Sequence, residues 1–340
     1  MGPRVAHLRG AVLNARPTNS SPARQRGIAL LTAIVLFAIA TILAAAITYN
    51  KAMSARRAAA TFALDQALQA GLAAESLAAL ALETSAKRSP SETLPTQPWA
   101  QAFGPVEIED TGIWVAGQLE DLQGRFNLNS LVIYDPAANA FVADPGSVKE
   151  FKQLLRQLDL EEKWADLVVD WIDTDIAPYG PDGGEDSLYL TQSPAYRPPN
   201  TFITSTSELL ALPGFGAERY QRIAPFVAAL PNDSKMNICT ARGVVLDAVR
   251  ADGQEEFQAS EPTGHRDGPC FPTRQSYLDG IAAPQPDDRA RVEARIDEKS
   301  NYFLLTSTVR IGTTEFVLYS VLFREQSGQI RTLQRTFGSE

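Results

Sequence analysis

Residues 28–47 read Ile-Ala-Leu-Leu-Thr-Ala-Ile-Val-Leu-Phe-Ala-Ile-Ala-Thr-Ile-Leu-Ala-Ala-Ala-Ile, and no charged side chain occurs between Gly27 and Asn50. A helix of 20 residues spans about 30 Å, which is the thickness of the hydrocarbon core of a bilayer. Five arginines and no acidic residue precede it, so the N-terminus is predicted to stay in the cytoplasm. We therefore expect one membrane-spanning helix over residues 28–50, with the rest of the chain on the far side.

A secretory signal peptide is cut after its apolar stretch at small residues, but here the stretch is too long and no good A-x-A site ends it. The block Arg24-Gln-Arg-Gly27-Ile28 instead resembles a type IV prepilin site. In that family a membrane peptidase cuts after the glycine, and the apolar segment remains. The resemblance implies that residues 1–27 are a leader, that cleavage separates Gly27 from Ile28, and that a prepilin peptidase is a partner.

The helix is predicted to continue beyond the membrane. Residues 51–87 are rich in alanine and leucine, contain no proline and have Gly71 as their single glycine. The segment Ser89-Pro90-Ser91 then ends the helix. We expect a stripe of large apolar residues to pack on a globular domain, as in a pilin; it comprises Phe62, Leu64, Leu68, Leu72, Leu77 and Leu80. An ordinary anchor followed by a helical linker is the alternative.

The rest of the chain predicts an α+β domain. Alternating apolar and polar residues indicate strands at 106–109, 112–120, 302–311, 314–324 and 330–335. Helical patterns lie between the early and late strands, at 147–158, 161–172, 205–212, 217–230 and 240–249. We expect a pilin-like antiparallel sheet domain, built from residues 51–130 and 288–340. A large all-helical domain, residues 131–287, is inserted into it.

Composition narrows the class of protein. Without the leader, 26 basic and 40 acidic side chains give a net charge of −14, so general nucleic-acid binding is not expected. The only histidines are His7 and His265, which disfavours histidine-rich metal sites. Cys239 and Cys270 could form one disulfide outside the cytoplasm, or remain two buried thiols.

The stretch 170–189 is the richest in functional groups, because it contains six acidic residues and no basic one. Asp173 and Asp175, two glycine turns, and then Glu185 and Asp186 could wrap oxygen ligands around Ca²⁺. The spacing is not that of an EF-hand. A solvated acidic loop is one alternative, and a hydrolase in which Asp173 and Glu185 act as acid and base is another.

A second motif, Leu212-Pro-Gly-Phe-Gly216, resembles the turn of a helix-hairpin-helix. In DNA-binding versions the turn amides hold a phosphate, and Arg219 and Arg222 could assist. The surroundings are acidic, so we favour a packing unit in which the glycines supply positive φ. A minor pilin of a type IV pilus or DNA-uptake filament, touching DNA with this turn, remains the alternative function.

Several segments together resemble the general secretion pathway protein K (GspK) family, the large minor pseudopilins of type II secretion. They occur in the family's order from residue 27 to about 330. The matching segments are Gly27-Ile-Ala-Leu-Leu31, Asp65-Gln-Ala-Leu68, Gly124-Arg-Phe-Asn-Leu-Asn129, Asp170-Trp-Ile-Asp-Thr-Asp175, Glu185-Asp-Ser-Leu-Tyr-Leu190, Pro194-Ala-Tyr-Arg197, Ser207-Glu-Leu209 and Asn237-Ile-Cys-Thr-Ala241.

The resemblance implies a subunit in the inner membrane with most of its chain in the periplasm. It implies N-methylation of Ile28 and Ca²⁺ held by Asp173, Asp175, Glu185 and Asp186. It also implies a complex with minor pseudopilins I and J at the tip of a short periplasmic filament, where the complex starts assembly and supports export through the outer membrane. In that role the protein is not an enzyme and needs no nucleic acid.

Counting from Ile28, the fifth residue of the processed chain is Thr32. Most pilins have a glutamate there. A carboxylate in lipid is costly unless it is paired, and in a filament it pairs with the N-terminal amine of a neighbouring subunit. Thr32 needs no such neighbour, which favours a position at the tip of the filament, with no subunit above.

Overall fold

The computed structural model describes residues 25–250, 257, 270, 273–281 and 286–338, so most of the predicted leader lies outside the described residues. The chain forms two units, residues 1–62 and residues 63–340. Helix α1 (Gln25–Arg88) is continuous and supplies residues to both. The predicted long helix and its end before Ser89 are therefore confirmed.

In the first unit, α1 is long and apolar enough to cross a membrane. Its apolar side chains are exposed on all sides, as expected of a segment whose solvent is lipid. The threonine hydroxyls are satisfied within the helix: Thr41 donates to the carbonyl of Ala38 at 2.8 Å. Thr32 donates to the carbonyls of Ile28 and Ala29, at 3.1 and 3.0 Å. Thr32 therefore enters an apolar environment without needing an external partner.

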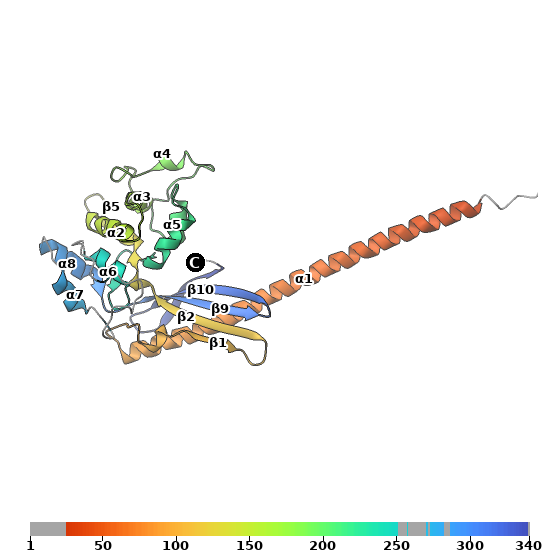
Figure 1. The fold of residues 1–340 in the computed structure, drawn as a ribbon, viewed down its shortest axis with the longest axis horizontal. Helices are drawn as coiled ribbons and strands as arrows, with labels where there is room; N and C mark the ends of the chain where they lie inside the picture. Colours follow the sequence, from red (N-terminus) through yellow and green to blue (C-terminus); the bar gives the residue numbers. More distant parts are fainter. Residues whose placement is uncertain (1–24, 251–256, 258–269, 271–272, 282–285, 339–340) are drawn as a thin grey trace, which may run out of the picture. The chain divides into compact units, whose positions relative to one another are not determined.

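The second unit contains a five-stranded antiparallel sheet in the order β1-β2-β9-β10-β11, of which β1, β2, β9 and β10 are labelled in Figure 1. The predicted strands are confirmed, and so is the fold class of a long N-terminal helix, an antiparallel sheet and a large insertion. The strands are β1 (Phe103–Glu107), β2 (Ile113–Asp121), β9 (Tyr302–Ile311), β10 (Thr314–Arg324) and β11 (Ile330–Phe337).

The predicted packing stripe of α1 is wrong at four of its six residues, while Leu68 and Leu72 are half-buried. Leu77 and Leu80 are each 59% exposed, and Phe62 and Leu64 are exposed as well. The residues that pack on the sheet are mostly small: Ala67, Ala70, Gly71, Ala74, Ala78 and Leu82. The reason is close approach of helix and sheet, because a Cβ added at Gly71 would lie 2.8 Å from Leu318 Cδ2. A residue larger than glycine at position 71 would therefore collide with the sheet.

Strand β2 ends at Asp121 and its sheet neighbour β9 begins at Tyr302, so the intervening chain is an insertion between adjacent strands. Most of its buried apolar residues share one hydrophobic core. Its helices are η3 (Leu122–Gly124), η4 (Leu128–Leu131), α2 (Pro145–Gln157), α3 (Lys163–Ile172), α4 (Asp186–Tyr189), η5 (Thr206–Ala211), α5 (Gly216–Ile223), η6 (Ala224–Phe226), α6 (Gly243–Val249), α7 (Arg274–Gly280) and α8 (Pro286–Arg295). Its strands are β3 (Phe126–Asn127), β4 (Val132–Asp135), β5 (Ala140–Ala143), β6 (Val227–Ala228), β7 (Met236–Asn237) and β8 (Ile296–Asp297).

The insertion is mainly helical, but it is not all-helical. The hairpin β4–β5 was not expected, because strands of four residues are too short to show a clear alternation. The helix predicted at 205–212 is the 3₁₀ helix η5, and the one predicted at 217–230 ends at Ile223, just before Pro225. The predicted domain boundaries at residues 131 and 287 stay predictions.

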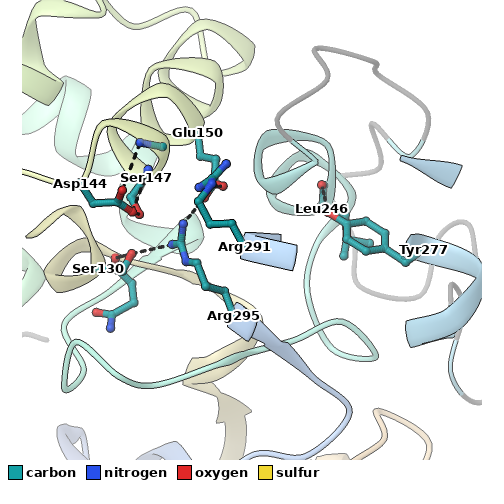
Figure 2. Close-up of polar contacts among 10 residues, drawn as sticks. Ser130, Asp144, Ser147, Glu150, Leu246, Tyr277, Arg291 and Arg295 are labelled. Carbon is teal, nitrogen blue, oxygen red and sulfur yellow. Dashed lines mark hydrogen bonds and ion pairs between the residues drawn. The ribbon is translucent and has the colours of Figure 1, made fainter. Parts of the chain in front are cut away.

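The late helices are attached to the body of the insertion by polar contacts (Figure 2). Arg291 and Arg295 of α8 donate to the two carboxylate oxygens of Glu150 on α2, at 2.7 and 2.5 Å. The Glu150 side chain is fully buried. Tyr277 of α7 donates to the carbonyl of Leu246 on α6 at 2.6 Å. These contacts join segments that are distant in sequence.

Candidate metal centre

The acidic stretch begins inside α3. This helix is buried on all sides from Trp164 to Ile172, and Asp170 lies in its last turn. At Asp173 the backbone becomes extended, one turn after Asp170. Residues three apart lie on one helix face, so both carboxylates point the same way. Glu185 arrives from the other side of the loop, directly before α4, which is anchored by the fully buried Tyr189.

The loop gathers Asp170, Asp173 and Glu185. Each offers one carboxylate oxygen such that the three oxygens lie within 4.8 Å of one another, and all three residues are buried. The Asp170 carboxylate accepts hydrogen bonds from the amides of Tyr179 and Gly184, at 2.7 and 2.5 Å. These bonds fix its orientation and hold the loop around it.

Gly183 is required by this close approach. A Cβ at this position would lie 2.5 Å from Asp170 Oδ2 and 2.4 Å from the carbonyl oxygen of Tyr179. No side chain fits in that space. The glycine pair 183–184 therefore lets the loop backbone reach the carboxylates.

The electrostatics of the cluster are unfavourable without a cation. Burial and the charges of Asp175, Asp170 and Glu185 raise the pKa of Asp173 to about 8. Burial and the neighbouring carboxylates also raise the pKa of Glu185 to about 7. The pKa of Asp170 rises to about 6, mainly through burial, although its two amide donors act in the opposite direction. A divalent cation among these groups would reverse all three shifts.

The residues present fit such an ion. Among the described residues, Asp173 Oδ1 and Glu185 Oε1 are buried and have no hydrogen-bond partner. Buried, unpartnered carboxylate oxygens are costly, and a hard cation is the natural acceptor of their lone pairs. Asp170, Asp173 and Glu185 would hold it. Because Ca²⁺ takes six to eight oxygen ligands, backbone carbonyls and water would complete the shell.

Two of the predicted ligands lie elsewhere. Asp175 is exposed, and its Oδ1 accepts the amide of Ala177 at 2.8 Å. Asp186 forms an ion pair with Arg197 at 3.2 Å. Asp170 was not among the predicted ligands, although its spacing from Asp173 on a helix face could have indicated it. The structure does not place Asp175 or Asp186 in the three-carboxylate group.

The metal-free cluster should give the protein an unusual pH dependence. The folded-state pKa values of Asp173 and Glu185, about 8 and about 7, exceed those of unfolded carboxyl groups, about 4. The folded state then holds more protons than the unfolded state between these values, and the free energy of unfolding falls as the pH rises through that range. We expect wild-type protein in chelator to unfold at a lower temperature at pH 8 than at pH 5.

The variant Asp173→Asn should reduce this pH difference, because it removes the most strongly shifted group. Asp182→Asn, in the exposed part of the same loop, should leave it unchanged. An equal pH difference in wild type and Asp173→Asn, measured by thermal unfolding, would contradict the assignment.

The turn at residues 212–216 packs on the core of the insertion through Leu212 and Phe215, while Gly214 and Gly216 are exposed. Gly214 and Gly216 have φ of +83° and +76°, which explains the glycines. Phe215 is buried and its ring contacts Trp164 edge-to-face, with centroids 5.0 Å apart. Arg219 is held by Glu161 at 2.7 Å. These contacts support the packing interpretation of the motif.

Cys239 and Cys270 form a disulfide in the structure. Cys239 is fully buried beside the Asn237 side chain, whose Oδ1 accepts the Cys239 amide at 2.9 Å. Glu298 lies near the two sulfur atoms, but sulfurs bonded to each other are poor metal ligands. The bridge is therefore structural.

A long apolar helix that continues along an antiparallel sheet defines a pilin-like, membrane-anchored protein. Residues 124–232 match the family model described as "Type II secretion system (T2SS), protein K". The chain is 31% identical to the type II secretion system protein K of Pseudomonas aeruginosa, over 92% of this chain and 93% of the relative. The chain therefore belongs to the type II secretion system protein K family.

A further relative and a solved structure point to the same family. The protein K of Klebsiella pneumoniae is 31% identical over 93% of this chain and 97% of its own. One solved structure, the GspK-GspI-GspJ complex from enterotoxigenic Escherichia coli, contains a chain with a TM-score of 0.71 and 27% identity. The match covers 84% of this chain and all of that chain.

Proposed function

We propose that this chain is a minor pseudopilin that forms a complex with pseudopilins I and J at the tip of the periplasmic pseudopilus and starts its assembly. Membership of the protein K family carries the proposal. The solved relative is named for its complex with GspI and GspJ. In this role the protein is structural and has no catalytic step. It is anchored in the inner membrane by α1, and most of its chain lies in the periplasm.

Two features of the chain support the tip position. Thr32 satisfies its hydroxyl on the carbonyls of its own helix, so the anchor requires no charged neighbour within the bilayer. The insertion between β2 and β9 makes the globular unit large, which suits a terminal position better than a repeated one.

Co-purification tests the function. The full-length chain, tagged and produced together with pseudopilins I and J of the same system, should bring both down from solubilised membranes. Retention of neither, when all three proteins are present in the membrane, would contradict the proposal. The alternative function, a DNA-contacting minor pilin, would instead require salt-sensitive DNA binding.

Processing of the N-terminus is a separate prediction. Mass spectrometry of the mature protein should find Ile28 as its first residue, carrying one added methyl group. The variant Gly27→Leu should accumulate as the uncut precursor in the membrane. A wild-type mature chain that begins at any other residue would contradict the prepilin assignment.

We further propose that Ca²⁺ is bound by Asp170, Asp173 and Glu185. The support is the group of buried carboxylates, two of which have an oxygen without a hydrogen-bond partner among the described residues. The ion would neutralise the repulsion in the loop and fix the chain between α3 and α4. Its role is stabilisation of the insertion.

A further inference from the structure

The β4–β5 hairpin is held only weakly by its own pairing. It is a separate sheet of two four-residue strands, and a hairpin of that size is marginally stable in water by itself. Val132 is buried in the core of the insertion, but its neighbours Ile133 and Tyr134 are 56% and 47% exposed. The position of β5 therefore depends on contacts that come from outside the hairpin.

Thr174 supplies hydrogen bonds of this kind to β5. The amide of Phe141 donates to Thr174 Oγ1 at 3.2 Å, and the amide of Thr174 donates to the carbonyl of Phe141 at 3.3 Å. Both main-chain polar groups of Phe141 are thus bonded to one residue, as they would be to a neighbouring strand. Among the described residues, every hydrogen bond from β5 to a segment outside the hairpin goes to Thr174.

The place of Thr174 is set in turn by the group of three carboxylates. Thr174 directly follows Asp173, where α3 has ended and the backbone is extended. Asp173 is 2% exposed, and its Oδ1 has no hydrogen-bond partner among the described residues. Repulsion from Asp170 and Glu185 drives this carboxylate outward, whereas an ion shared by the three residues draws it inward. The position of Thr174 therefore depends on whether the ion is bound.

Residues 200–202 connect the same loop to the same hairpin. Asn200 donates from Nδ2 to the carbonyl of Asp175 at 2.9 Å. Two residues later, the ring of Phe202 meets the ring of Phe141 edge-to-face, with centroids 4.8 Å apart. The acidic loop, the hairpin and this segment therefore each contact the other two, so a movement of the loop is transmitted to β5 by two routes.

We infer that cation binding in the loop after α3 locks the β4–β5 hairpin, through the contact of Thr174 with Phe141. The inference rests on the proposed calcium site. With the ion bound, Asp173 stays in the group and Thr174 covers the outer side of β5. Without the ion, repulsion among the carboxylates moves Thr174 away, and the amide of Phe141 opens to water. The ion site thus controls a two-stranded sheet whose own residues are not among the three carboxylates.

Hydrogen exchange at the amide of Phe141 tests the coupling. Full-length protein in detergent at pH 8 is compared in chelator and in saturating Ca²⁺, with exchange resolved to single residues by mass spectrometry. Ca²⁺ should slow exchange at Phe141 about tenfold or more, because exchange there requires the contact with Thr174 to open. The amide of Gly112 is the control, since it donates to the exposed side chain of Glu107 at 2.9 Å, and its exchange should not respond to Ca²⁺.

Coupling between two sites is reciprocal, so loss of the contact must weaken Ca²⁺ binding. Thr174→Val removes the hydroxyl that accepts the Phe141 amide and leaves all three carboxylates in place. It should raise the Kd for Ca²⁺, measured by titration calorimetry, by a factor similar to the slowing of exchange in wild type. Thr191→Val is the matched control, because the exposed Thr191 hydroxyl donates to the carbonyl of Leu188 at 2.7 Å. It should keep the wild-type Kd.

Phe141→Ala tests the coupling from the hairpin side. It removes the ring contact with Phe202 and changes no residue of the acidic loop. Because an aromatic pair of this kind contributes to the lock, the Kd for Ca²⁺ should rise about threefold or more. Phe337→Ala removes a ring that is 41% exposed on β11 and should leave the Kd unchanged.

Equal exchange at Phe141 in chelator and in Ca²⁺, in protein that binds the ion by calorimetry, would overturn the coupling and leave the calcium site intact. A wild-type Kd in Thr174→Val, or an equal rise of the Kd in Thr191→Val, would overturn it as well. If wild type binds no Ca²⁺, the calcium proposal fails and this inference fails with it. The pseudopilin function is tested separately by co-purification.

Discussion

Calcium should raise the thermal unfolding midpoint of the protein by about 5 to 10 °C. A ligand at 100 times its Kd stabilises the folded state by about 2.7 kcal/mol. For a domain of this size each kcal/mol shifts the midpoint by about 2 to 4 °C. The measurement is calorimetry of the purified full-length chain in detergent at pH 8, with chelator and then with excess Ca²⁺. The shift should be smaller at pH 5, where protons compete for Asp173 and Glu185.

Variants separate the cluster from a general ion effect. Asp173→Asn and Glu185→Gln should each abolish most of the calcium shift, because each removes a buried carboxylate of the group. Asp182→Asn, exposed in the same loop, should keep the whole shift. Asp175→Asn distinguishes the three-carboxylate group from the ligand set implied by the family resemblance. If Asp175→Asn keeps the full calcium-induced shift of the unfolding midpoint, the ligands are Asp170, Asp173 and Glu185. If this variant loses the shift, Asp175 is a calcium ligand after all.

Removal of the Glu150 carboxylate should destabilise the globular unit by about 3 kcal/mol. Breaking a buried ion pair leaves the opposite charges without a partner, and this costs about 3 to 5 kcal/mol. The lower end applies here because the side chains of Arg291 and Arg295 are 23% and 24% exposed and can partly regain water. Figure 2 shows the two guanidinium groups converging on Glu150. Glu150→Ala should therefore loosen α8 from α2.

Chemical denaturation of the full-length chain measures this effect, with the calcium concentration held constant. Glu150→Gln should cost less than Glu150→Ala, since the amide oxygen still accepts one of the arginine donors. Glu162→Ala is the control, because Glu162 forms an exposed pair with Arg156 at 3.3 Å and such pairs contribute little. A loss in Glu150→Ala no larger than in Glu162→Ala would show that the two arginines do not depend on Glu150.

Much of the fold could be predicted because its signals are local. An uncharged run of bilayer length, a segment without proline, and alternating strands each depend only on neighbouring residues. The late strands were predicted to within two residues, and the helices α2 and α3 nearly as well. The short hairpin β4–β5 and the end of α5 were missed, since a few residues contain too little periodic pattern.

The site was predictable as a segment but not as a set of ligands. The density of acidic residues in 170–189 indicated where a cation would bind. It could not distinguish Asp170 from Asp175, because both belong to one acidic run. The difference comes from the path of the loop, which turns Asp170 inward under the amides of Tyr179 and Gly184 and leaves Asp175 in solvent.

By itself the sequence determined the membrane anchor, the continuous helix, the antiparallel sheet and the place of the acidic loop. These follow from hydropathy and periodicity, which are properties of contiguous residues. Only the tertiary structure decided that alanines face the sheet, that Glu150 meets arginines more than 140 positions away, and that Asp170 joins Asp173 and Glu185 in one group. Those features depend on how closely distant segments approach, and contact distance between distant segments is not encoded in any local pattern.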